Sequence, residues 1–151
     1  MISYKHTQTG YLILFVALVA SVFFAWLFWI IPETEPRLSV AVLMVAIVLL
    51  LVSFSTLTVA IDEQYVRIQF GYGIFRKKFP VKDIVSANPV KNHWYYGWGI
   101  RLWLWPYMWI YNVSGFDAVE IVMTNGRIYR IGTDVQSELE AALQRVLRSQ
   151  N

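Results

Sequence analysis

The chain has 151 residues, of which 57% are hydrophobic and only 15% are charged, and its formal net charge is +3. A soluble domain carries about a quarter charged residues, so this composition favours contact with lipid and gives no argument for nucleic acid binding. The absence of cysteine excludes disulfides, thiolate metal sites and cysteine nucleophiles.

Two uncharged runs follow a short N-terminal segment, 1–10, and cover residues 11–31 and 38–61. A helix crosses the hydrocarbon core of a bilayer in about 20 residues, so each run predicts a transmembrane helix. The alternative for the first run is a cleaved signal peptide, whose apolar part has about 7–15 residues. The loop at 32–37 contains two prolines, which cannot continue a helix interior, and it therefore predicts a tight antiparallel hairpin.

The basic residues indicate the orientation of this hairpin. Eleven Lys and Arg residues follow position 61, whereas the loop holds only Arg37 and the N-terminal segment only Lys5. Because basic residues accumulate on the cytoplasmic side, we expect a multi-pass protein of the inner (plasma) membrane with both termini in the cytoplasm.

Three small residues, Ala17, Ser21 and Ala25, lie four positions apart on one face of the first expected helix. Small residues at this spacing let helix backbones approach closely in membranes. We expect this face to pack on the second helix of the same chain, and the alternative is a homo-oligomer interface.

Residues 62–151 change to the period-two alternation of β-strands. A strand at 65–70 is followed by a Gly-Tyr-Gly turn and a second strand. A two-residue turn would pair Val66 with Phe79 and Arg67 with Lys78, with the basic pair on the outer face and Lys77 on the inner side.

Further elements are expected along the same region. The pair Asn125-Gly126 predicts a hairpin with a type I′ turn, and "DIVSANPV" and "MWIYN" read as strands. The segment "TLTVAI" is rich in β-branched residues and is expected to leave the membrane helix in an extended conformation. An amphipathic helix is expected at about 134–149, begun by a capping box of Thr133 and Gln136.

The order of these elements, with "FRKKFPVKDI", "YGWGIR" and "YNVSGFDAVEIVMTNGRIYRIGTD", resembles the bacterial PH-like domain membrane proteins. The resemblance covers nearly the whole chain and is most specific at 96–134. It implies a membrane α-hairpin plus an α+β domain, 62–151, in which a PH-like antiparallel β-barrel or sandwich is closed by the C-terminal helix. The family is largely uncharacterised, so the resemblance implies a fold more than an activity.

A basic patch is the main candidate site, and it comprises Arg67, Arg76, Lys78, Lys82 and Lys91. Near a membrane, each basic residue could add about 1 kcal/mol of attraction to anionic headgroups. The alternative is a solvated strand whose charges prevent edge-to-edge pairing. Lipid-binding PH domains carry a Lys, spacer, Lys/Arg-x-Arg pattern in their first hairpin, which this chain matches only in part.

Nine aromatic side chains lie between Trp94 and Tyr111, but Arg101 and Pro106 interrupt this stretch, and its uncharged part is too short to span a membrane. Stacking on single-stranded nucleic acid would need a basic groove beside the rings. The remaining alternatives are a barrel core and a loop at headgroup level. We expect a mixture, with 100–103 and 109–111 inside and 104–108 at a lipid-facing tip, where the interfacial side chains are Trp105, Tyr107 and Met108.

Catalytic chemistry is not expected. His6 and His93 are the only histidines, and the carboxylates show no metal or acid–base spacing, so no enzyme, metal or cofactor is predicted. We expect a membrane-apposed binding or scaffolding module whose partners are the bilayer and its anionic headgroups. The alternative is an accessory subunit of a membrane complex or transporter, with a membrane protein partner or a second copy.

Overall fold

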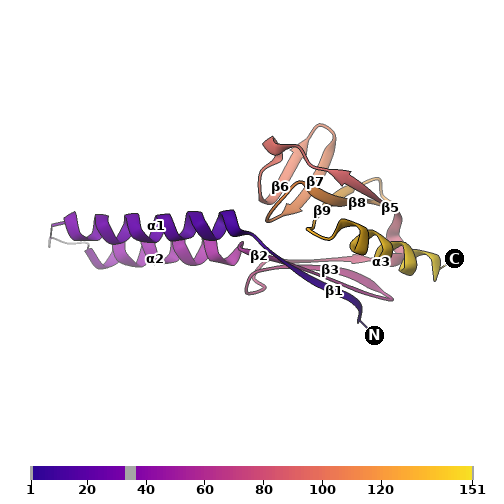
Figure 1. The fold of residues 1–151 in the computed structure, drawn as a ribbon, viewed down its shortest axis with the longest axis horizontal. Coiled ribbons are helices and arrows are strands. Elements are labelled where there is room, and N and C mark those ends of the chain that lie inside the picture. Colours follow the sequence, from indigo (N-terminus) through magenta and orange to yellow (C-terminus); the bar gives the residue numbers. More distant parts are fainter. Residues whose placement is uncertain (1, 33–36, 151) are drawn as a thin grey trace.

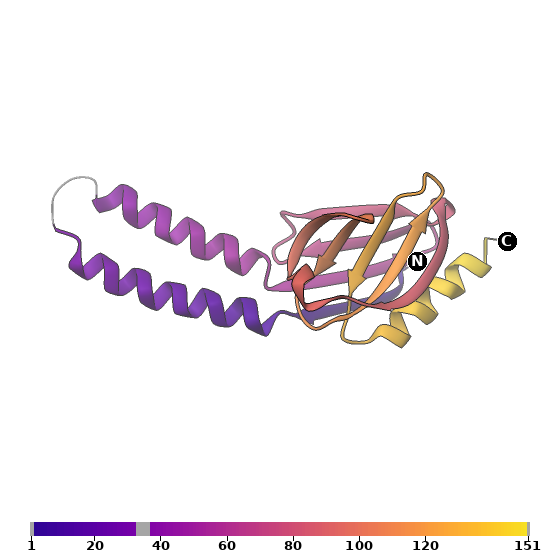
Figure 2. The ribbon, with the colours of Figure 1, turned by 90° about the horizontal axis from the view of Figure 1, so that it is seen from above.

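The computed structural model describes residues 2–32 and 37–150, so most of the predicted loop at 32–37 lies outside the described residues. Two antiparallel helices, α1 (Tyr11–Ile30) and α2 (Arg37–Ser53), lie side by side and project from one end of a β-rich module (Figures 1 and 2). Among the described residues, only α1 is long and apolar enough to cross a membrane; α2, with 17 residues, falls short of about 20.

The predicted second span at 38–61 is wrong in its last third. The helix ends at Ser53, and β2 (Thr56–Asp62) follows at once. The extended conformation expected for "TLTVAI" is confirmed. Its residues alternate between half-buried and buried, and β2 has a paired strand on each side, so sheet hydrogen bonds replace the helical ones.

The N-terminal segment, for which no secondary structure is predicted from the sequence, contains a strand. β1 (Ile2–Thr9) pairs with β2 in antiparallel fashion along its length. The β module therefore begins at residue 2, and the helix pair is inserted between its first two strands.

The first sheet has the order β1-β2-β3-β4, with β3 at Tyr65–Phe70 and β4 at Arg76–Pro80. The predicted β3–β4 register is confirmed, because Val66 pairs with Phe79 and Arg67 with Lys78. The alternation decides this register, since a slip by one residue would turn buried Val66 toward solvent.

The second sheet has the order β5-β8-β9-β7-β6. Its strands are β5 (Ile84–Lys91), β6 (Gly99–Leu104), β7 (Tyr107–Asn112), β8 (Asp117–Met123) and β9 (Ile128–Gly132), with short 3-10 turns η1 (Val81–Asp83) and η2 (Trp94–Tyr96). β7 and β9 run parallel, so the expected wholly antiparallel arrangement is wrong at this pair. The β6–β7 hairpin comes before β8 in the chain and attaches to the edge of β9 that β8 leaves open.

The β8–β9 hairpin is confirmed, but its turn is not type I′. The Met123 N–H donates to the Arg127 carbonyl at 2.9 Å, which leaves a three-residue loop, and only Gly126 has positive φ, at 77°. A type I′ turn needs positive φ at both central residues. Asn125 instead accepts a hydrogen bond from the Arg127 N–H at 3.1 Å, which holds the wider loop.

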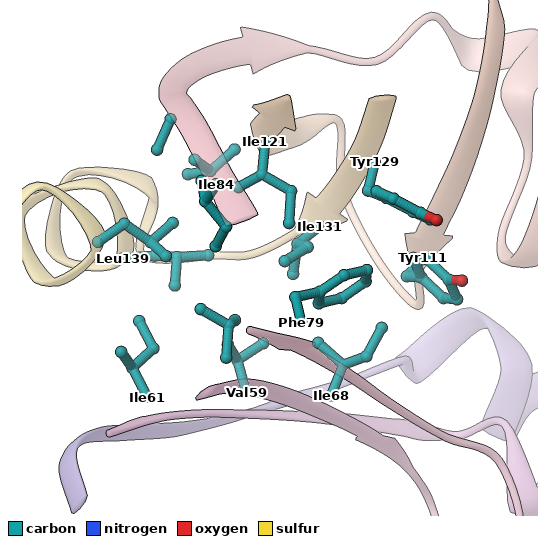
Figure 3. Packing of buried hydrophobic residues seen from close by; sticks show 14 of the residues in the cluster. Val59, Ile61, Ile68, Phe79, Ile84, Tyr111, Ile121, Tyr129, Ile131 and Leu139 are labelled. Atoms are coloured by element: carbon teal, nitrogen blue, oxygen red, sulfur yellow. The ribbon is translucent and has the colours of Figure 1, made fainter. Parts of the chain in front are cut away.

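The core lies between the two sheets and under α3 (Gln136–Arg148), whose Leu139 and Leu143 are buried (Figure 3). The predicted capping box is wrong. The Gln136 side chain donates to the carbonyls of Val90 and Ala118, at 2.8 and 2.7 Å, and so ties the helix to the second sheet.

Candidate membrane-apposed surfaces

The helix pair leaves the module from two neighbouring strands. Thr9 and Thr56 are the last pair of the β1–β2 ladder, and the Gly10 N–H donates to the Ser55 carbonyl at 2.6 Å. A Cβ at Gly10 would lie 2.7 Å from the Val113 carbonyl oxygen, so no larger residue fits at this junction. The module ends of α1 and α2 are therefore fixed side by side without a linker.

The predicted basic patch is divided by the fold. Arg67 and Lys78 are opposite each other on the outer face of the first sheet, and the same row continues through Ala60 to Lys5. Lys5 thus joins the patch, which sequence reasoning missed because β1 was not recognised. Lys82 lies on η1, and Lys91 lies at the end of β5 in the other sheet.

Two of the predicted basic residues have acidic neighbours. Arg67 is 2.7 Å from the Asp62 carboxylate, whereas the exposed Lys91 is 4.0 Å from Asp117. Burial raises the pKa of Asp62, but hydrogen bonds from the N–H groups of Gln64 and Tyr65 and the charge of Arg67 outweigh this effect, so its pKa lies below the ordinary value. Arg67 is therefore already engaged as a structural partner of a carboxylate.

The outer face of the first sheet extends away from the helix pair. β2 and β3 lie roughly parallel to the long axis of the helix pair (Figure 1). The outer face of the first sheet is therefore also roughly parallel to that axis. At about 3.3 Å per residue, the row of Arg76 lies about 7 Å beyond the Thr9–Thr56 pair and the row of Lys78 about 13 Å beyond it. Of these two rows, that of Arg76 is nearer to the helix ends.

The β3–β4 turn lies directly against the end of α2. A Cβ at Gly71, whose φ is +42°, would overlap the Ser53 carbonyl oxygen. Tyr72 and Ile74 project from this turn and are largely exposed, and the Arg76 Nε donates to the Gly73 carbonyl at 2.5 Å. We call Tyr72, Ile74 and Arg76 the proximal rim, because they surround the turn beside the helix ends.

Lys77 lies on the inner side of β4, opposite Ile68, as the register predicts. It lines a cavity of about 200 Å³ between the two sheets, together with Ile100 and Tyr111. Burial, and then the neighbouring Tyr129, raise the pKa of Tyr111 to about 12, so its hydroxyl stays protonated at neutral pH.

The aromatic stretch includes the β6–β7 hairpin, and two of the three side chains predicted at its tip are exposed. Trp105 is 90% exposed and Tyr107 is also exposed, but Met108 is fully buried. Alternation along β7 explains this correction, since Met108 points to the side opposite Tyr107 and packs with Tyr96 and Ile110.

The hairpin tip is remote from the helix ends. Val113, the residue after β7, lies against Gly10, which comes just before α1. Tyr107 lies six residues before Val113 along the strand, and is therefore about 20 Å from it. Figure 1 shows the hairpin to one side of the helix axis. The exposed ring of Trp105 is thus far from the point at which the chain enters α1.

The three small residues of α1 occupy different environments. Ala17 is buried in the helix pair, and the Ser21 hydroxyl donates to its carbonyl at 2.7 Å. Ser21 and Ala25 line an apolar groove of about 420 Å³ between α1 and α2. Ala17 is thus buried, as a helix contact requires, whereas Ala25 is exposed.

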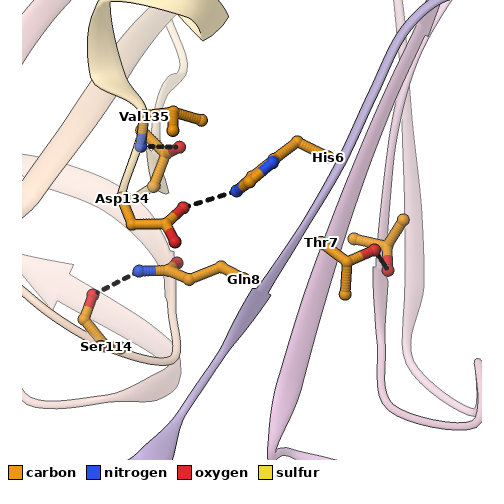
Figure 4. Close-up of polar contacts among 8 residues, drawn as sticks. His6, Thr7, Gln8, Ser114, Asp134 and Val135 are labelled. Atoms are coloured by element: carbon orange, nitrogen blue, oxygen red, sulfur yellow. Dashed lines mark hydrogen bonds and ion pairs between the residues drawn. The ribbon is translucent and has the colours of Figure 1, made fainter.

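The histidines have structural contacts. The His6 Nε2 lies 2.6 Å from an Asp134 carboxylate oxygen, and Gln8 donates to the Ser114 carbonyl at 2.9 Å, which joins β1 to the second sheet and the start of α3 (Figure 4). Burial, followed by the charges of Glu138 and Asp134, raises the pKa of Tyr4 to about 12. The His93 ring stacks on Tyr95, with the centroids 5.0 Å apart.

Within residues 2–32 and 37–150, no three His, Asp or Glu side chains gather in a group that could hold a metal ion. Comparison with protein-family models, with curated proteins and with solved structures finds no match to this chain. The functional argument therefore depends on the geometry of the junction and the exposed surfaces.

Proposed function

We propose that this is an integral membrane protein in which a hairpin of apolar helices holds a PH-like β module against the cytoplasmic leaflet of the inner membrane. The module serves as a binding or scaffolding unit. The observation that carries the proposal is the pairing of β1 with β2, because these strands flank the helix pair. If α1 enters the bilayer, α2 must bring the chain back to the same side. The proposal therefore requires α2 to cross although it is shorter than the usual length of about 20 residues; its 17 residues equal the lower limit of the range for spanning helices, about 17–25.

A cleaved signal peptide fits this arrangement poorly. Cleavage after α1 would remove β1, which pairs with β2 and carries the contacts of His6 and Gln8 to the rest of the module. An edge strand with such long-range partners belongs to the mature fold. We therefore treat α1 as a permanent anchor.

The PH-like assignment is supported by two packed sheets and a C-terminal helix that closes the core between them. The β1 strand and the parallel β7–β9 pair depart from a simple antiparallel PH-like arrangement. These departures do not disturb the hydrophobic core between the two sheets, since β2–β5, β8, β9 and α3 provide most of its buried residues.

The proximal rim is the surface that we expect to contact lipid headgroups. Tyr72 and Ile74 would lie at the headgroup level, and the Arg76 guanidinium beside them would attract anionic phosphate. Because the helices already hold the module, this contact would set its orientation.

Spin-label depth measurements test this proposal in the full chain, which offers a cysteine-free background. A label at Tyr72→Cys in anionic nanodiscs should show headgroup-level immersion, whereas its matched control at Trp105→Cys should be fully aqueous. A fully aqueous label at Tyr72→Cys would remove the headgroup contact from the proposal.

A second candidate function is that of an accessory subunit of a membrane complex. Two exposed apolar surfaces favour it, namely the α1–α2 groove with Ala25 and the tip with Trp105. Photo-crosslinking in intact membranes from Ala25 and Trp105, with Val85 as an exposed control, distinguishes the two functions. A discrete adduct from either position and none from Val85 would favour a subunit, and no discrete adduct would favour a monomer docked on lipid.

A further inference from the structure

An apolar groove lies where the helix pair meets the β6 side of the module. Its walls are Leu12 and Val16 from the start of α1, Leu51 near the end of α2 with Phe54 just after that helix, and the Gly97–Arg101 segment. The volume is about 530 Å³, within the roughly 300–1,000 Å³ of ligand pockets. Leu12 and Val16 are exposed, so the groove is continuous with the apolar outer surface of α1.

The segment opposite the helices is shaped by two glycines. Gly97 and Gly99 have φ values of 69° and 95°, a backbone conformation that other residues rarely adopt. They form the bend that brings Trp98 and Arg101 to the groove. The "GWG" sequence therefore has a structural reason that does not involve a nucleotide phosphate loop.

Arg101 supplies the one charge among the residues that line this groove. Its Nε donates to the Trp98 carbonyl at 3.2 Å, which fixes the guanidinium direction and leaves the terminal nitrogens available to a ligand. No described carboxylate forms an ion pair with Arg101. An oriented, exposed guanidinium beside an apolar groove is suited to a phosphate group attached to a hydrocarbon chain.

We propose that the groove is a binding site for one anionic phospholipid of the bilayer, with an acyl chain along Leu12 and Val16 and the phosphate on Arg101. This inference rests on the proposed function, since it needs α1 in a membrane. Two features select a membrane lipid as the occupant. The groove is continuous with helix surface that faces acyl chains, and its only charge lies at the module end, where a headgroup would be.

Native mass spectrometry of the full chain tests the site. The chain is reconstituted with equal amounts of phosphatidylglycerol and phosphatidylcholine, released into mild detergent, and examined for retained lipid. The wild type should retain one phosphatidylglycerol in preference to phosphatidylcholine. Arg101→Gln should lower this preference about tenfold, the size expected for a lost charge-assisted contact, and Arg101→Lys should restore part of it.

The groove itself is tested by Val16→Phe, which fills it and should reduce retention of both lipids. Arg127→Gln, on the exposed β8–β9 turn, and Val19→Phe, on α1 outside the groove, are matched controls that should behave as the wild type. Equal retention in the wild type, Arg101→Gln and Val16→Phe would overturn the site.

Membrane anchoring is measured separately for each variant by resistance to an alkaline wash. Arg101→Gln and Val16→Phe should remain fully anchored. A chain that is anchored but retains no specific lipid would refute this inference alone. Release of the wild type by the wash would refute the proposed function as well.

Discussion

In α1, Phe15 is 61% exposed and Trp29 is 86% exposed, whereas in the β module Val66 and Ile110 are completely buried. Large apolar side chains of similar kind thus have opposite surroundings in the two regions. Burial of apolar surface is worth about 25 cal/mol per Å² in water, and monomeric soluble proteins rarely expose large contiguous apolar patches. This difference supports the proposal that the helix pair lies in lipid, while the module folds against water.

The strongest test of this comparison separates the two regions. Replacing residues 10–55 by Asn-Gly would join Thr9 to Thr56 through a two-residue hairpin turn, since these residues are paired at the junction. The product should be soluble and folded, with membrane association lost entirely, as judged by fractionation and circular dichroism. An insoluble or unfolded product would mean that the module depends on the helices.

A core substitution should have the next largest effect. Phe79 is buried between the sheets, and its ring centroid is 4.7 Å from that of Tyr129. Phe79→Ala should lower the free energy of unfolding by about 3–5 kcal/mol, measured by denaturant titration in mild detergent. Phe15→Ala on α1 is the matched control and should leave the free energy of unfolding almost unchanged. Equal decreases for the two variants would contradict the difference between the two regions.

A charge in the middle of α1 should disturb only the membrane region. Leu18→Lys is expected to cost about 2.5–3.5 kcal/mol of insertion free energy, because Leu18 is exposed on the helix surface. The fraction that resists an alkaline wash should fall. Val85→Lys, at an exposed position of β5, should leave this fraction unchanged. Undiminished anchoring of Leu18→Lys would place the outer surface of α1 in water.

The Asp62–Arg67 pair should give the smallest effect, of about 1 kcal/mol, because Arg67 is partly exposed. The lowered pKa of Asp62 means that its contribution is present above the ordinary carboxyl pKa of 3.8 and is lost as pH falls through the lower pKa of the folded state. Unfolding of wild type and Asp62→Asn should therefore differ near pH 7 and converge in strong acid. A difference that does not change with pH would assign the effect to packing.

Elements with strong local alternation could be predicted from the sequence. The β3–β4 register follows from Val66, Ile68 and Phe70, whose apolar side chains leave one acceptable face. The helix pair, likewise, follows from uncharged length alone, but that length overestimates α2, because the uncharged run continues from the helix through most of β2.

Features that depend on distant partners could not be predicted. β1 carries His6 and Gln8 on its inner side, and these side chains are satisfied by Asp134 and Ser114, more than 100 residues away. Gln136 matches a local capping pattern, yet its amide finds carbonyls of the second sheet. In each case the side chain is held by a hydrogen bond to a residue that is distant in the sequence, which no local pattern indicates.

The sequence predicts the types of residue in the candidate site, but not how they are arranged relative to the helices. Arg67, Arg76 and Lys78 share an outer face as expected, but the direction of that face relative to the helices follows from the β1–β2 junction. Arg101 was not singled out, because a single arginine among aromatic residues gives no pattern. Its importance becomes visible only when the Gly97–Arg101 segment is seen beside α1 and α2.

The most direct test of the central claim is the sidedness of three single cysteines in the naturally cysteine-free chain. Thr7→Cys precedes α1, Lys78→Cys follows α2, and Pro32→Cys lies beyond the far end of α1. In sealed vesicles, an impermeant maleimide should label Thr7→Cys and Lys78→Cys from the cytoplasmic side only, and Pro32→Cys from the other side only. Labelling of Thr7→Cys and Lys78→Cys from opposite sides would contradict the account.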